Sequence, residues 1–185
     1  MKEMLEGLRV LASLLLFVYV SFSDYRTREV SNGAWLFFAP PVFALTLTEL
    51  FLYNPSDMLY YGMSLGLTVV FATILFYSGV FGGADAKALM CLAIALPFYP
   101  EDLFSPLSGE ISPISQKLLP MAVFSNSFLL AAATVFYIFL RNILWHRKAS
   151  RVFFEGEQKN ESFGKKLLVL ITGYKVPINN LKEKR

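Results

Sequence analysis

The sequence predicts an all-α protein, a polytopic bundle of about five transmembrane helices followed by a short polar tail. Hydrophobic residues make up 55% of the 185 residues, and the mean hydropathy is +0.50. Lys and Arg are absent from residues 29–86, 88–116 and 118–140. A helix needs about 20 mainly apolar residues to cross a bilayer. These windows without Lys or Arg are long enough to hold several such helices.

The first two apolar runs are separated by a short polar turn. Leu8–Ser23 is the first span, and it extends toward the N-terminus if the Arg9 side chain reaches the headgroups. No small-residue cleavage site follows it, so we expect a retained helix rather than a signal peptide. The second span, Ala34–Leu52, contains Pro40 and Pro41. These prolines should kink it, because proline donates no backbone hydrogen bond.

Three further apolar runs complete the predicted path. Met58–Val80 is the third span and Leu118–Leu140 the fifth. Between them, Ala86–Phe98 is shorter than a usual span, although a helix from Gly83 to Tyr99 would be just long enough. We expect this run to cross, because otherwise the acidic segment around Glu101 would lie inside the cell and the basic segment after the fifth span outside it.

The basic residues gather on one side of this path. Of the 17 Lys and Arg residues, only Lys2, Arg9 and Lys117 fall on the other side. Cytoplasmic flanks carry the excess of Lys and Arg. We therefore predict a multi-pass protein of the cell membrane whose N-terminus is outside. Its transmembrane domain covers residues 1–150, and a cytoplasmic tail covers residues 151–185.

Four other features have structural interpretations. In the tail, Leu167–Thr172 is too short to span and is expected to form a strand or an interfacial segment. Trp35 is expected in the aromatic belt at the membrane surface. Glu49 should be reached by water at the outer end of the second span. Cys91, the single cysteine, is expected to be a small buried apolar side chain.

Two aspartates stand where apolar runs meet short polar turns. Asp24 lies in SFSDYRTREVSN and Asp85 in FGGADAKALM. Two long runs separate them, so the chain crosses and returns, and both carboxylates should end at the cytoplasmic face. Each alone is compatible with an ordinary helix-end acid, and Asp85 with a first-turn acid favoured by the helix dipole.

Together, the two carboxyls suggest catalysis. Ionisable groups in a membrane protein's spans are costly and are candidates for function. Two neighbouring carboxyls share one proton, so the charged one can activate water while the protonated one polarises a peptide carbonyl. The pattern favours an aspartyl endopeptidase.

Two other functions fit the same pattern. A channel, transporter or assembly scaffold could use Asp24 and Asp85 to bind a cation or relay protons, although such proteins usually place these acids near the midplane. A presenilin-like protease that cuts inside spanning segments would place its acids deeper. One cysteine and one histidine, His146, form no metal-ligand cluster in the sequence. We expect no metal, no other cofactor and no nucleic-acid partner.

The two motifs resemble the signatures of the type IV prepilin peptidases, the GxGD aspartyl proteases that serve type IV pili. The matching positions are Asp24, Arg26, Arg28 and Asn32 in the first motif and Gly82, Asp85 and Lys87 in the second, where Gly83 is the variable position. Ala84 departs from the pattern, which has glycine there. The archaeal preflagellin (prearchaellin) peptidases of the archaellum are the more similar branch, because the chain lacks the cysteine-rich loop of many bacterial members.

The resemblance implies a substrate and roles for the motif residues. Asp24 and Asp85 would be catalytic, and the other motif residues would support them, with Arg26, Arg28 and Lys87 as interfacial anchors that hold the aspartate turns. The substrate would be a prearchaellin or prepilin-like precursor, cut after its short basic leader at the cytoplasmic face. The likeness covers about residues 8–150. Family members commonly have one more span, so this is either a natural short form or a truncated chain.

Overall fold

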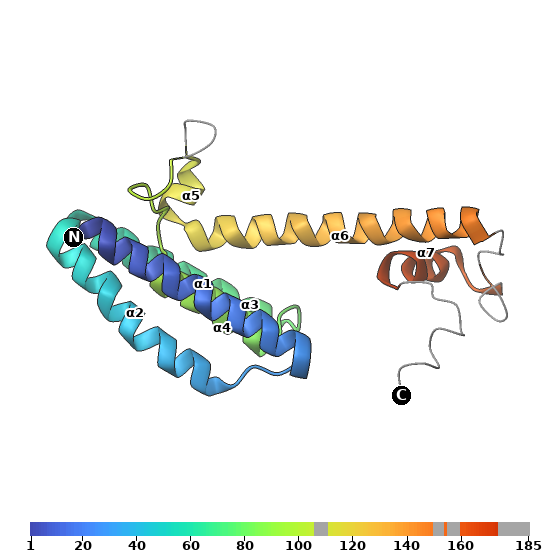
Figure 1. The fold of residues 1–185 in the computed structure, drawn as a ribbon, viewed down its shortest axis with the longest axis horizontal. Helices are drawn as coiled ribbons and strands as arrows, with labels where there is room; N and C mark the ends of the chain where they lie inside the picture. Colours follow the sequence, from blue (N-terminus) through green and yellow to red (C-terminus); the bar gives the residue numbers. More distant parts are fainter. Residues whose placement is uncertain (106–110, 150–153, 155–159, 174–185) are drawn as a thin grey trace. The chain divides into compact units, whose positions relative to one another are not determined.

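The computed structural model describes residues 1–105, 111–149, 154 and 160–173, and every described element is helical. The chain divides into two compact units, Met1–Ser125 and Asn126–Arg185. The elements, coloured along the chain in Figure 1, are α1 (Lys2–Thr27), α2 (Asn32–Tyr53), the 3-10 turn η1 (Pro55–Asp57), α3 (Met58–Tyr77), α4 (Gly83–Ala95), α5 (Pro113–Lys117), α6 (Leu119–Ala149) and α7 (Phe163–Thr172).

Helices α1 to α4 form a bundle in which each helix runs antiparallel to the one before it (Figure 1). Helix α4 contacts α1, α2 and α3, so it is the central element of the first unit. Helix α2 stays helical through Pro40 and Pro41 and curves around one side of the other three (Figure 1). Two missing backbone donors at these prolines account for the curvature. The all-α polytopic class predicted from the sequence is confirmed.

Four helices of the described residues are long and apolar enough to cross a membrane. They are Lys2–Thr27, Asn32–Tyr53, Pro55–Tyr77 and Leu119–Trp145, which correspond to the predicted first, second, third and fifth spans. Helix α4 has 13 residues and is therefore about 20 Å long. It falls short of the roughly 30 Å hydrocarbon core, and its helix stops before the predicted Phe98 end.

The last turn of α4 ends inside the bundle, where side chains of the surrounding helices donate hydrogen bonds to its free carbonyl groups. The Arg9 guanidinium donates to the Ala95 carbonyl at 2.9 Å, and the Thr46 hydroxyl donates to the Ile94 carbonyl at 2.9 Å. Backbone carbonyls away from water must find such donors, because an unsatisfied one costs several kcal/mol in hydrocarbon. A helix too short to span is thus accommodated by polar side chains from α1 and α2.

Arg9 and Glu49 form a buried ion pair rather than separate contacts with headgroups and water. The guanidinium lies 2.6 Å from the Glu49 carboxylate, and the two residues are 6% and 4% exposed. Arg9 is therefore held by Glu49 rather than free to extend to the headgroups, and Glu49 is buried rather than openly exposed to water. Each charge is compensated by the other, and this pairing makes burial possible.

Trp35 is also buried, at 7% exposure, and packs in an apolar cluster with Leu16, Phe38, Val42 and Cys91. The prediction of a surface belt position for Trp35 is wrong. Its ring faces α1 and α4 because the first turn of α2 lies against both helices. Cys91 is buried as expected.

The second unit contains most of α6 together with α7. The Asn142 side chain is 2% exposed and donates to the backbone carbonyls of Leu170 and Gly173, at 2.8 and 2.7 Å. These bonds attach the end of α7 to α6. The segment Leu167–Thr172 is part of helix α7, so the strand alternative is wrong. The predicted domain boundary at 150/151 falls among residues outside the described set and stays a prediction.

The Arg9–Glu49 pair should dominate the stability of the first unit. Arg9→Met leaves a buried carboxylate unpaired and the Ala95 carbonyl without its donor, so we expect the free energy of unfolding in detergent to fall by about 3 kcal/mol. The double variant Arg9→Met, Glu49→Met should lose less, because no charge is left unpaired. Arg26→Met, on the exposed part of the same helix, is the control. Equal losses for Arg9→Met and Arg26→Met would contradict this account.

Candidate active site

Both predicted aspartates line one pocket, at the end of the bundle where α1 finishes and α4 begins. The pocket has a volume of about 570 Å3. Asp24, Arg28, Gly82, Gly83, Asp85 and Lys87 are among its lining residues. Residues from α1, the turn after it, the start of α2 and the start of α4 thus converge on a single cavity. We refer to it below as the aspartate pocket.

Asp85 is placed by the first turn of α4. Its carboxylate accepts a hydrogen bond from the Gly82 backbone N–H at 3.1 Å, and Gly82 is the residue that caps this helix. The bond satisfies one of the free N–H groups that every helix start carries. A Cβ atom on Gly82 would lie 3.1 Å from the same carboxylate oxygen, so a side chain there would push the Asp85 carboxylate aside by a few tenths of an ångström. At Gly83 the nearest atom, on Phe76, is at an ordinary 3.6 Å.

Asp24 is placed by the last turn of α1. The helix ends at Arg28, which adopts the left-handed conformation at φ 59° and donates its backbone N–H to the Asp24 carbonyl at 2.9 Å. The Ser23 and Thr27 hydroxyls both donate to the Glu29 carbonyl, at 2.8 and 2.9 Å. These bonds fold the chain back on itself, and the Asp24 side chain stays exposed at the pocket.

The comparisons with known proteins agree with the two motifs. The model of the type IV leader peptidase family matches residues 11–136. This chain belongs to the type IV leader peptidase family.

Three preflagellin peptidases are similar to this chain. The one from Methanococcus maripaludis is 25% identical over 174 residues, which cover 91% of this chain and 68% of the relative. The one from Methanocaldococcus jannaschii is 28% identical over 127 residues, 67% of this chain and 53% of the relative. The one from Methanococcus voltae is 26% identical over 133 residues, 70% of this chain and 56% of the relative.

The chain therefore spans between about half and two thirds of the length of these relatives. No solved structure matches the chain. The family expected from the two motifs is confirmed.

A hydrogen bond joins the two motifs of this chain. The Lys87 ammonium donates to the Asn32 side-chain oxygen at 2.6 Å, which connects the first turn of α4 to the first turn of α2. Ser31 begins α2 by accepting a hydrogen bond from the Gly33 N–H at 3.2 Å. Lys87 is thus more than an interfacial anchor, because it ties together two helix starts at the aspartate pocket. Asn32 contributes through this bond, and Arg26 does not line the pocket.

The sequence patterns did not indicate Trp35 as a residue of this site. Trp35 lines the aspartate pocket, and its indole nitrogen is buried without a hydrogen-bond partner among the described residues. Residues three apart on a helix share a face, so the position of Trp35 three residues after Asn32 could have placed it beside the motif. Its aromatic character at a span end suggested an interface residue instead.

The Lys87–Asn32 bond should contribute measurably to the stability of the protein. Lys87→Met and Asn32→Ala should each lower the free energy of unfolding, and the double variant should lose less than the sum. The coupling energy expected for one exposed charged hydrogen bond is about 1 kcal/mol. Thermal unfolding of the four proteins in detergent measures it. Strict additivity would show that the two motifs are not coupled through this bond.

Proposed function

We propose that the chain is a membrane-embedded aspartyl endopeptidase that removes the leader of a preflagellin or prepilin-like precursor. The observation that carries the proposal is the convergence of Asp24 and Asp85, from distant helix ends, on one pocket of about 570 Å3. Both side chains are exposed there, so water and an extended peptide can reach them. Family membership supports the peptidase activity, and the names of three relatives support the substrate class.

The proposed chemistry needs only these two carboxyls and a water molecule. When the two are close, the second proton cannot leave easily, so one carboxyl is ionised and the other is protonated. The ionised carboxylate takes a proton from the water that attacks the peptide carbonyl, and the protonated carboxyl donates a hydrogen bond to the carbonyl oxygen. The nitrogen of the leaving chain then receives a proton. Both carboxyls return to their starting states without a covalent intermediate.

The surroundings of the two aspartates support these two roles, one carboxyl as general base and the other as hydrogen-bond donor. The Gly82 N–H holds one Asp85 oxygen at 3.1 Å and so orients the carboxyl. The Asp24 carboxyl has no hydrogen bond or ion pair with another described side chain, which leaves it available to water or substrate. Arg28 and Lys87 line the same pocket. Lys87 is held in place by Asn32.

The position of the pocket supports a leader substrate. The aspartate pocket lies at the end of α1 and at the starts of α2 and α4, which is the level at which spanning helices emerge from the bilayer. A precursor whose leader precedes an apolar helix would present its scissile bond at that level. The excess of basic residues on this side of the chain supports a cytoplasmic location for the reaction. Glu29 also lines the pocket and would attract a basic leader.

Cleavage of a co-expressed preflagellin tests the catalytic assignment. Asp24→Asn and Asp85→Asn should each slow leader removal by at least about 100-fold, because asparagine can neither accept nor donate the proton. Asp57→Asn is the matched control, since Asp57 lies at the opposite end of the bundle and does not line the aspartate pocket. All three proteins should accumulate in membranes. Processing at the parent rate by both pocket variants would reject the aspartyl mechanism.

Labelling of introduced cysteines tests the sidedness. Ser105→Cys should react with a membrane-impermeant maleimide in intact cells, whereas Tyr25→Cys, beside the aspartate pocket, should react only after the cells are opened. Both positions are exposed, and the native Cys91 is buried, so the background should be low. The reverse pattern would place the aspartate pocket outside and overturn the cytoplasmic assignment.

A further inference from the structure

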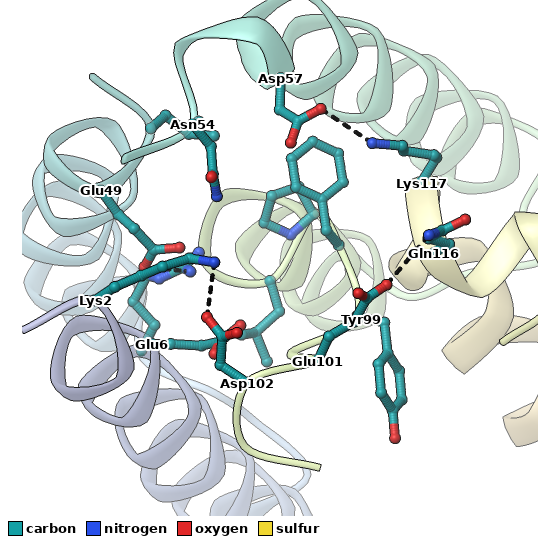
Figure 2. A pocket seen from close by; sticks show the side chains of 15 residues that line it. Lys2, Glu6, Glu49, Asn54, Asp57, Tyr99, Glu101, Asp102, Gln116 and Lys117 are labelled. Carbon is teal, nitrogen blue, oxygen red and sulfur yellow. Dashed lines mark hydrogen bonds and ion pairs between the residues drawn. The ribbon is translucent and has the colours of Figure 1, made fainter. Parts of the chain in front are cut away.

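A second polar pocket lies at the opposite end of the bundle, formed by the start of α1, the end of α2, the segment after α4, and α5 (Figure 2). Its volume is about 260 Å3. None of the residues that line it lines the aspartate pocket. The ends of spanning helices form it, so it lies near the level of the lipid headgroups.

The three basic side chains of this second pocket are all paired with carboxylates. The pairs, two of which are drawn with dashed lines in Figure 2, are Lys2–Asp102 at 2.7 Å, Arg9–Glu49 at 2.6 Å and Lys117–Asp57 at 3.0 Å. Each pair neutralises its own charge.

Two further carboxylates in the same pocket, Glu6 and Glu101, form no ion pair at contact distance among the described residues. Lys2 and Arg9 attract Glu6 from farther away. Glu101 accepts a hydrogen bond from the neutral Gln116 amide at 3.2 Å. Glu6 is 6% exposed, and its Oε2 atom is buried without a hydrogen-bond partner in the described part of the chain. Burying an unpaired carboxylate is costly, and the cost is removed either by a proton or by a donor that carries positive charge.

We propose that this second pocket binds a small primary ammonium group, with Glu6 as its main anchor and Glu101 as a second carboxylate. The described residues contain no group of three or more His, Cys, Asp or Glu side chains arranged to hold a metal ion. The Glu6 oxygen that lacks a hydrogen-bond partner instead suits a positively charged N–H donor. A primary ammonium offers three such N–H groups. The group belongs either to a soluble amine or to an amine-headed lipid.

Thermal unfolding of the full chain in detergent tests the chemistry of the site. Ethylammonium at about ten times its dissociation constant should raise the melting temperature by roughly 4 °C. Tetramethylammonium at the same ionic strength should not raise it, because it carries the charge without an N–H donor. Equal shifts with the two cations would overturn the proposal.

Variants test the site itself. In Glu6→Gln the response to ethylammonium should disappear, whereas Glu3→Gln, an exposed acid on the same helix, should respond like the parent. A response that persists in Glu6→Gln would overturn the assignment to this pocket. If Glu6→Gln does not fold, Glu101→Gln replaces it. A weakened response in that variant supports the assignment, and an unchanged response rejects it.

A comparison of two lipids distinguishes a lipid headgroup from a soluble amine as the source of the ammonium group. The parent protein is placed in nanodiscs of phosphatidylethanolamine or of phosphatidylcholine, whose headgroups differ in having a primary or a quaternary ammonium. A higher melting temperature in phosphatidylethanolamine that vanishes in Glu6→Gln identifies a lipid ligand. Stabilisation by free ethylammonium without a lipid difference identifies a soluble amine. Stabilisation by neither primary ammonium source overturns the proposal.

Discussion

The buried end of α4 is the constraint on which the first unit depends. Helix α4 has 13 residues and is shorter than the hydrocarbon core, so its last carbonyl groups end within the bundle and take their hydrogen bonds from side chains. Arg9, Thr46 and Ser64 extend from three different helices toward the carbonyls of Ala95, Ile94 and Pro97. The burial of Arg9 in turn requires Glu49. One backbone requirement therefore explains why polar and charged side chains lie inside an otherwise apolar bundle.

The same constraint bears on the proposed active site at the other end of α4. Because the C-terminal end of the helix is held by α1, α2 and α3, its first turn has a defined depth, and Asp85 stands in that turn. The Lys87–Asn32 bond holds the turn against the start of α2. Asp24 comes from the chain reversal that connects α1 to α2. Rigid elements thus carry both carboxyls to one pocket, as a reaction that depends on their mutual geometry requires.

The two polar ends of the bundle differ in how their charges are compensated. At one end, Asp24 and Asp85 are exposed and are held only by local backbone bonds, which suits groups that must exchange protons. At the other end, three ion pairs neutralise most of the charge, and Glu6 stands out because one of its oxygens is buried and unmatched. Burial without a partner is costly, so such a group is more informative about a ligand than any exposed acid.

The sequence by itself determined the helical class, the four long spans and the two motifs, because apolar length and motif spacing are local properties of the chain. Only the tertiary structure decided the roles of Arg9, Glu49 and Trp35. Each looked like an interfacial residue, since hydropathy records the polarity of a side chain and not the partner it will meet. Arg9 and Glu49 are 40 positions apart and Arg9 and Ala95 are 86 apart. Contacts over such separations arise from packing, which buries a charge where a suitable partner is already in place.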